Sequence, residues 1–130
     1  MKTTLMMILL ATLCFQCTSQ NTIENEPELI KKSEKIKNML IQTDYDGVTA
    51  DFNSQMMEAL KPAQLKQVWE GLIQQIGNYQ SDGAVTSSRL QGYRVIYSIL
   101  KFEKSPFKLK VVFDQEDQVA GLFLIPVNAK

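Results

Sequence analysis

The stretch PFKLKVVFD, residues 106–114, decides the fold because apolar and polar side chains alternate along it. A period of two is typical of a β-strand that buries one of its faces. The alternating apolar residues are Phe107, Leu109, Val111 and Phe113. Residues 93–103 and 119–125 on either side are rich in apolar residues, and both links to the central stretch are short and polar. We therefore predict three antiparallel strands that pair in the order of the sequence.

The two outer segments of this predicted meander carry apolar side chains on both faces. In the first segment, Leu100 and Tyr97 point to opposite faces. In the last segment, Leu122 and Phe123 do the same. One face must pack on helices, and the other needs a cover because large apolar surfaces are uncommon on soluble monomers. We expect a partner protein or a second copy of the chain on this outer face. The alternative is that a terminal tail or an early helix folds over it.

Apolar residues at helical spacing precede these strands and predict helices over residues 29–42, 44–60 and 62–77. In the second helix the apolar residues recur at every fourth position, at Val48, Phe52, Met56 and Leu60. A weaker pattern over residues 78–92 predicts one more strand at the edge of the sheet. Because helices and strands are segregated along the chain, we predict an α+β fold with three N-terminal helices packed on an antiparallel sheet of about four strands.

Composition narrows the possible functions. The chain has 130 residues, 14 basic and 14 acidic side chains, and no histidine. This length fits one domain, and the balanced charge gives no reason to expect nucleic acid as a partner. Without histidine, serine–histidine–aspartate and cysteine–histidine catalysis and most zinc sites are excluded within the chain. We therefore expect no catalytic residues, no metal and no cofactor, and a protein that is not an enzyme.

Residues 1–19 resemble an export signal. The chain starts with Met1-Lys2, and Leu5–Phe15 form an apolar run that is too short to span a membrane. Cys17 precedes a polar stretch and resembles the acylated cysteine of a bacterial lipoprotein. Three outcomes stay open: acylation of Cys17, simple secretion after cleavage near Ser19, and an uncleaved anchor.

This interpretation divides the chain into three parts. Residues 20–27 form a polar tether, and residues 28–127 form a single α+β domain. The expected location is the periplasm or the outer membrane, the latter as an anchored lipoprotein. The alternative is secretion from the cell.

Several short motifs, taken in order, resemble those of family 3887 of domains of unknown function. They are Asp44-Tyr45-Asp46, Asp51-Phe52-Asn53, Leu65 with Trp69 and Gly77, Phe102-Glu103, Val111-Val112-Phe113-Asp114 and Ala120-Gly121-Leu122. The resemblance covers residues 28–126 and implies a cone similar to nuclear transport factor 2 and the cystatins, with helices against a curved antiparallel sheet. In that family the domain often precedes an α/β-hydrolase domain in secreted bacterial proteins. This chain has no Gly-x-Ser-x-Gly nucleophile motif, so the hydrolase activity does not carry over.

A cone of this kind can hold a pocket between its helices and the concave face of its sheet. The resemblance therefore makes seven side chains candidates for binding a ligand or partner, and for all of them the alternative is ordinary core packing. The candidates are Phe52, Met56, Trp69, Tyr97, Phe107, Phe113 and Phe123.

Together these observations predict an exported, non-catalytic binding or interaction module of the bacterial cell envelope, acting through the cone pocket or the outer sheet face. The expected partners are a second copy of the chain, an envelope protein, or a small apolar ligand or peptide, with membrane contact only through a lipid anchor. One alternative is an accessory domain for a separately encoded α/β-hydrolase. Another is a small enzyme in which a buried carboxylate, with Asp51 as the best candidate, moves a proton.

Overall fold

The structure is a computed structural model that describes residues 26–127 of the chain. The predicted export signal, the acylation of Cys17 and all but the end of the predicted tether lie outside these residues. None of the helices in this range combines the length and the hydrophobicity that a membrane span requires.

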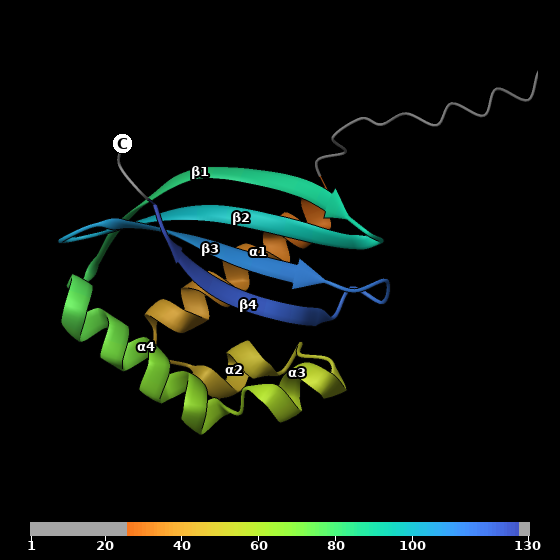
Figure 1. Ribbon diagram of the computed structural model, residues 1–130, viewed down its shortest axis with the longest axis horizontal. Coiled ribbons are helices and arrows are strands. Elements are labelled where there is room, and N and C mark those ends of the chain that lie inside the picture. The colour runs from red at the N-terminus through yellow and green to blue at the C-terminus, as the bar shows by residue number, and fades with distance from the viewer. Residues whose placement is uncertain (1–25, 128–130) are drawn as a thin grey trace, which may run out of the picture.

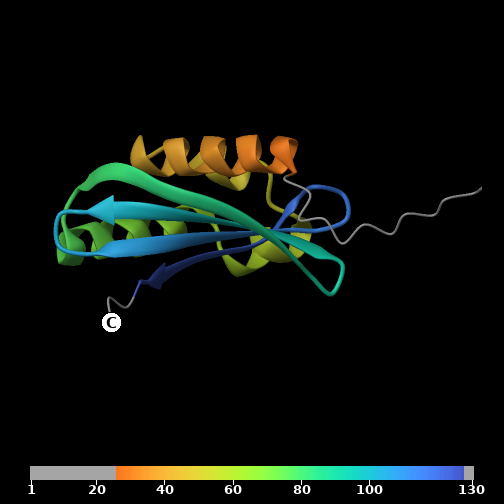
Figure 2. The same ribbon diagram turned by 90° about the horizontal axis from the view of Figure 1, so that it is seen from above.

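Helices come first and strands second, which confirms the α+β class. The elements are α1 (Pro27–Ile41), α2 (Tyr45–Thr49), α3 (Ser54–Ala59), α4 (Pro62–Ile76), β1 (Tyr79–Leu90), β2 (Tyr93–Phe102), β3 (Pro106–Phe113) and β4 (Val119–Pro126). The strands form one antiparallel sheet in the order β1-β2-β3-β4, which confirms the meander and the added strand at its edge. Helix α1 crosses one face of the sheet, and the other three helices gather beside β4 (Figures 1 and 2).

One face of β3 forms the centre of the core, as its period of two predicted. Its four inward side chains are buried, and the residues between them are half-buried. They belong to one apolar cluster with Ile36 and Leu40 of α1. Val111 and Phe113 are both 0% exposed, and burying a side chain of this size stabilises a fold by about 1.5–3 kcal/mol. The packing of β3 against α1 therefore positions the remaining elements.

The second predicted helix, over residues 44–60, is wrong as a single element because α2 and α3 divide it. The Asn53 side chain accepts a hydrogen bond from the backbone N–H of Met56 at 2.8 Å and starts α3. The backbone around it pairs with β4 instead. The Val119 N–H donates to the Asp51 carbonyl at 2.8 Å, and the Asn53 N–H donates to the Val119 carbonyl at 2.9 Å. Backbone groups used in this way cannot continue a helix.

Helix α4 agrees with the third predicted helix. Pro62 is its first residue, where a missing N–H costs nothing, and Gly77 closes it with φ +86°. On the inward face, Trp69 packs edge-on against Phe102, with ring centroids 6.1 Å apart and 65° between the planes. This contact fixes α4 against the end of β2.

A charged pair joins α1 to the β1 edge of the sheet. The Lys37 ammonium lies 2.7 Å from a carboxylate oxygen of Asp82, with side chains 9% and 48% exposed respectively. The Tyr79 hydroxyl donates to the other carboxylate oxygen at 2.7 Å. Burial alone would raise the pKa of Asp82, but the hydrogen bonds from Lys37 and Tyr79 outweigh it and hold that pKa below its ordinary value. The exposed fractions show that Lys37 is the buried partner of the pair and that Asp82 is half-exposed.

This asymmetry predicts unequal costs for removing the two partners. Asp82→Asn leaves a buried ammonium without a counter-charge, and we expect it to lower the free energy of unfolding by about 1–3 kcal/mol. Lys37→Met leaves only a half-exposed carboxylate that still accepts from Tyr79, so we expect a change below about 1 kcal/mol. Urea unfolding followed by Trp69 fluorescence measures both, and an equal or larger cost for Lys37→Met would contradict the prediction.

Candidate functional site

The seven predicted binding residues do not form one site. Most of them serve the core: Phe52, Phe107 and Phe113 are buried in it, and Met56 packs against it. Tyr97 lies on the opposite, outer face of the sheet, half-buried between the buried Ile96 and Ser98. Within residues 26–127, Trp69 and Phe123 line the same hollow. The structure therefore brings Trp69 and Phe123 together at this hollow, and it places Tyr97 and Phe123 on the outer face on either side of Lys110.

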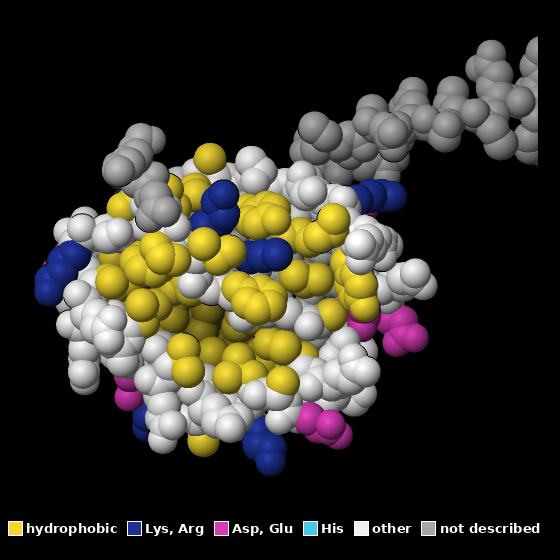
Figure 3. Space-filling view, viewed as in Figure 1, with side chains coloured by type: hydrophobic (Ala, Val, Ile, Leu, Met, Phe, Trp, Pro, Cys, Tyr) yellow, Lys and Arg dark blue, Asp and Glu magenta, His cyan; other side chains and the backbone are white. Residues whose placement is uncertain are grey.

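That hollow is an apolar groove between β4 and α4, which we call the β4–α4 groove. It has a volume of about 70 Å³ and is lined by Leu40, Leu60, Leu65, Val68, Trp69, Leu72, Leu109, Leu122, Phe123 and Leu124. Figure 3 shows it as a depression among hydrophobic side chains between the sheet and the helices. At its rim, Val68 is 63% exposed and Phe123 is 52% exposed. Val68 belongs to the helix predicted over residues 62–77, but helical spacing alone does not show which of its apolar side chains reach solvent.

The free edge of β4 adjoins the groove. The Val127 N–H donates to the Pro106 carbonyl at 3.2 Å, so its backbone faces β3. Because backbone direction alternates along a strand, Leu122 and Leu124 direct their N–H and C=O groups away from β3. No residue in the described part of the chain hydrogen-bonds to these outward groups. Pro126 has the same outward orientation, so its missing N–H breaks no ladder bond.

The outer face of the sheet continues from the groove across β4, β3 and β2. Phe123 belongs to both surfaces, and Ile125 beside it is 40% exposed. Helix α1 packs on the other face of the sheet (Figure 2), so the alternative in which this early helix covers the outer face is wrong. The terminal tail, the other predicted cover, lies outside the described residues.

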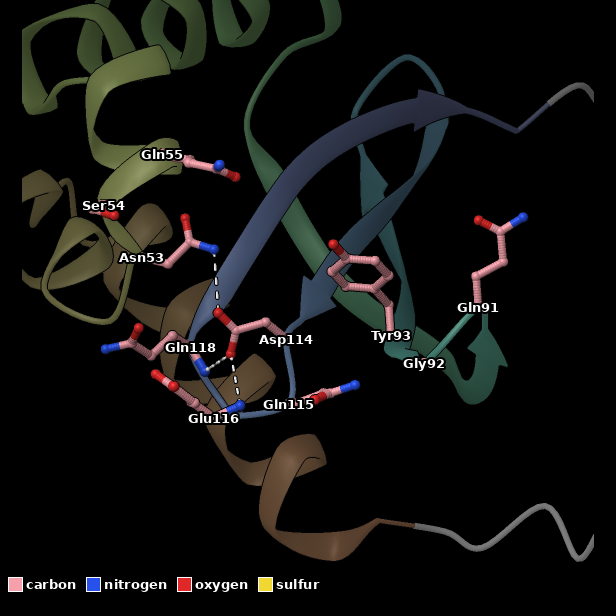
Figure 4. A pocket seen from close by; sticks show the side chains of 10 residues that line it. All are labelled: Asn53, Ser54, Gln55, Gln91, Gly92, Tyr93, Asp114, Gln115, Glu116 and Gln118. Carbon is pink, nitrogen blue, oxygen red and sulfur yellow. Dashed lines mark hydrogen bonds between the residues drawn. The ribbon is translucent and has the colours of Figure 1, made fainter.

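A second, polar hollow of about 460 Å³ lies at the loop between β3 and β4. Figure 4 shows Asp114 at its centre, between Asn53 and the loop backbone, with Tyr93 across from it. One Asp114 oxygen accepts from the N–H groups of Glu116 and Gln118 at 2.9 and 3.0 Å. The other accepts from the Asn53 side-chain amide at 3.2 Å. All of these donors hold the loop in place.

The protonation of Asp114 agrees with a structural role. Burial alone would raise its pKa, but the hydrogen bonds from Gln118, Asn53 and Glu116 and the charge of Arg94 hold the pKa below its ordinary value. A general base that works near neutral pH needs a shift in the opposite direction. Asp114 is therefore a hydrogen-bond acceptor for the loop.

Charged side chains at the same end of the molecule are paired with one another. Arg94 donates to the Asp114 carbonyl at 2.7 Å and also binds the carboxylates of Glu26 and Asp117. Lys32 of α1 donates to the Asp117 carbonyl at 2.8 Å. These bonds tie the start of α1 to the β3–β4 loop. Among residues 26–127, no group of three or more metal-binding side chains is placed to hold an ion.

Comparisons with known proteins point to one family. A family model described as "Protein of unknown function (DUF3887)" matches residues 33–122, which is more than half of the chain. No curated protein and no solved structure matches the chain.

The hydrogen bonds to Asp114 predict that the free energy of unfolding depends on pH. Asp114→Ala removes three hydrogen bonds, so we expect the free energy of unfolding at pH 7 to fall by about 1–3 kcal/mol. Because the folded pKa lies below the ordinary value of about 3.9, the contribution is complete above that value and is lost as the pH falls through the folded pKa. Urea unfolding from pH 7 to pH 2 should therefore show the two proteins converging in acid. Glu58→Ala, an exposed carboxylate, is the control, and a difference that persists unchanged at pH 2 would contradict the prediction.

Proposed function

The chain belongs to the family described as "Protein of unknown function (DUF3887)", and because that description names no activity, we propose a function from the geometry. The protein is a non-catalytic binding module that captures an extended segment of another protein at the β4–α4 groove. The observation that carries the proposal is an open groove lined by apolar residues, beside a strand edge where the backbone groups of Leu122 and Leu124 have no partner within residues 26–127.

The size of the groove favours a side chain as its occupant. Pockets for small molecules usually measure about 300–1,000 Å³. The groove, at about 70 Å³, is well below that range. It is open to solvent at Val68 and Phe123, so a leucine-like side chain of a partner can enter from outside. A segment that lies along the groove, and not a free ligand inside it, fits these dimensions.

The edge of β4 supplies the backbone contacts for such a segment. In β-strand addition, an extended peptide pairs with an exposed strand edge while its side chains occupy neighbouring pockets. The chain itself already starts a fifth strand at this edge, because Phe52 forms a parallel bridge with Val119. Beyond that bridge, nothing in the part of the chain that the structure describes pairs with the N–H and C=O groups of Leu122 and Leu124.

The two edges of the sheet differ in a way that supports this assignment. The β1 edge carries exposed polar residues such as Thr86, Ser88 and Arg89, which discourage pairing with another strand. The β4 edge carries Leu122 and Leu124, and no charged residue lies within β4. An apolar edge is retained where a partner covers it.

We also propose that the fold is a variant of the cone found in nuclear transport factor 2, and that the module works outside the cytoplasm. The order of elements and the twisted sheet over α1 (Figure 2) support the first statement. The export-like residues 1–19, with Cys17 near their end, support the second.

Titration with a capped eight-residue peptide of alternating leucine and serine tests the groove. We expect saturable NMR shifts at the amides of Leu122 and Leu124 and at the Trp69 indole. Val68→Asp places a charge at the apolar rim, so it should weaken binding by about tenfold or more. Gln67→Asp, at an exposed neighbouring position outside the groove, should leave binding unchanged.

The backbone contribution has its own control. The same peptide with N-methylated leucines cannot donate those hydrogen bonds, so we expect it to lose most of its affinity. Equal binding by Val68→Asp and by the parent protein would refute the groove as the site.

The mass of the intact protein isolated from cells tests the proposed export. We expect a chain that starts at Cys17 and carries acyl groups, with residues 1–16 removed. Cys17→Ser should abolish the acyl mass and release the protein from membranes. A mature mass that starts after Cys17 without acyl groups would contradict lipidation, and a mass that still includes Met1 would contradict cleavage.

A further inference from the structure

We infer that the outer sheet face recognises acidic side chains, so that the segment captured by this module alternates apolar and acidic residues. The inference rests on the proposed function, because it assigns chemistry to the side chains that a segment in the groove directs away from the groove. The surface concerned is the lysine–aromatic face, made up of Tyr97, Ile99, Lys101, Lys108, Lys110, Phe123 and Ile125.

Lysines and apolar side chains lie in rows across three strands of this face. Lys110 of β3 pairs with Tyr97 of β2 on one side and with Phe123 of β4 on the other. Lys108 pairs in the same way with Ile99 and Ile125 in the next row. Each cation is thus set among apolar neighbours near the middle of the face.

Aromatic rings hold two of the lysines in place. The Lys108 ammonium lies 5.2 Å from the ring centroid of Tyr97, and the Lys110 ammonium lies 5.4 Å from that of Phe123. Both distances are within the range of cation–π interactions. A ring contacts an ammonium on one side only, so N–H donors stay directed to the opposite side. The two cations are therefore positioned before any partner arrives.

No carboxylate in the described part of the chain neutralises these lysines. The strand residues on this face include no Asp or Glu, and Lys101, Lys108 and Lys110 form no ion pair within residues 26–127. The whole chain is balanced at 14 basic and 14 acidic residues. In Figure 3 some basic side chains lie within the hydrophobic surface and others lie at its periphery, whereas the acidic ones in this view lie only toward the periphery. This local excess of positive charge complements an anionic partner.

Phe123 connects the face to the groove, because it lines the groove and also contacts the Lys110 ammonium. Side chains of a strand alternate between its two faces. A segment beside β4 that places one side chain in the groove therefore places the next one toward the lysine–aromatic face. Carboxylates at those positions can approach the Lys110 ammonium, which leans over Phe123 toward the β4 edge.

A protein segment suits this surface better than two other occupants. A second copy packed face to face would bring two sets of lysines together without carboxylates between them, which is unfavourable. An anionic bilayer presents a broad surface that cannot enter the β4–α4 groove. Only an extended chain contacts the groove, the β4 edge and the lysines together.

Titration with three capped eight-residue peptides tests the inference, with leucine alternating with glutamate, serine or lysine. We expect the glutamate peptide to bind about tenfold more tightly than the serine peptide at low salt, and this advantage to shrink as salt screens the charges. The double variant Lys108→Glu with Lys110→Glu should reverse the preference toward the lysine peptide. The matched control is Lys31→Glu with Lys35→Glu, two exposed lysines of α1 on the other side of the sheet. If the double glutamate variant fails to fold, the double variant Lys108→Gln with Lys110→Gln replaces it. This variant should bind all three peptides with the same affinity.

Each outcome decides between the proposals. Equal binding of the glutamate and serine peptides would overturn the inference and leave the groove function standing. Binding of no peptide would overturn both. Two further results would replace the acidic segment with another occupant. They are tighter binding to vesicles of anionic lipid that is lost in the Lys108 and Lys110 variant, and a dimer in sedimentation that dissociates in that variant.

Discussion

The packing of one face of β3 against α1 is the constraint on which the rest of the structure depends. Val111 and Phe113 are fully buried there beside Ile36 and Leu40, so the helix and the sheet have a single relative placement. A sheet that buries one face in this way must leave the other face and both edges to be covered by other means. The binding properties proposed for this protein arise from the surfaces that α1 does not reach.

The other helices cover the β4 side incompletely. Helix α4 is fixed at Phe102 by Trp69, and the α2–α3 connection is fixed at Val119 by the backbone of Asp51 and Asn53. Between these two anchors the helices and the strand edge stay apart, and the β4–α4 groove lies in that interval. The groove thus results from the positions of the Trp69–Phe102 and Asn53–Val119 contacts. Its lining consists of apolar core side chains that lie between these two contacts.

Features with a local cause could be predicted from the sequence, and features that depend on distant contacts could not. The strands, the meander, the α+β class and the ends of α4 follow from periodicity, short links, Pro62 and Gly77. The break between α2 and α3 depends on Val119, which lies far along the chain. Helical spacing alone therefore predicted a single helix over residues 44–60. The groove residues were partly missed for a related reason. Periodicity identifies apolar stripes, but whether Val68 meets another element or solvent depends on the path of the whole chain.

The bridge between Phe52 and Val119 occupies one end of the β4 edge, and nothing within residues 26–127 pairs with its other end. A segment added at this edge can pair with β4 from Pro126 toward Leu122. It must end or bend away before Val119, because Asn53 already pairs with that residue. This stop sets the register of the added segment, because its side chains alternate in step with Leu122 and Leu124. Selectivity would then favour free chain ends, or segments followed closely by a bend, over the middle of a long extended stretch.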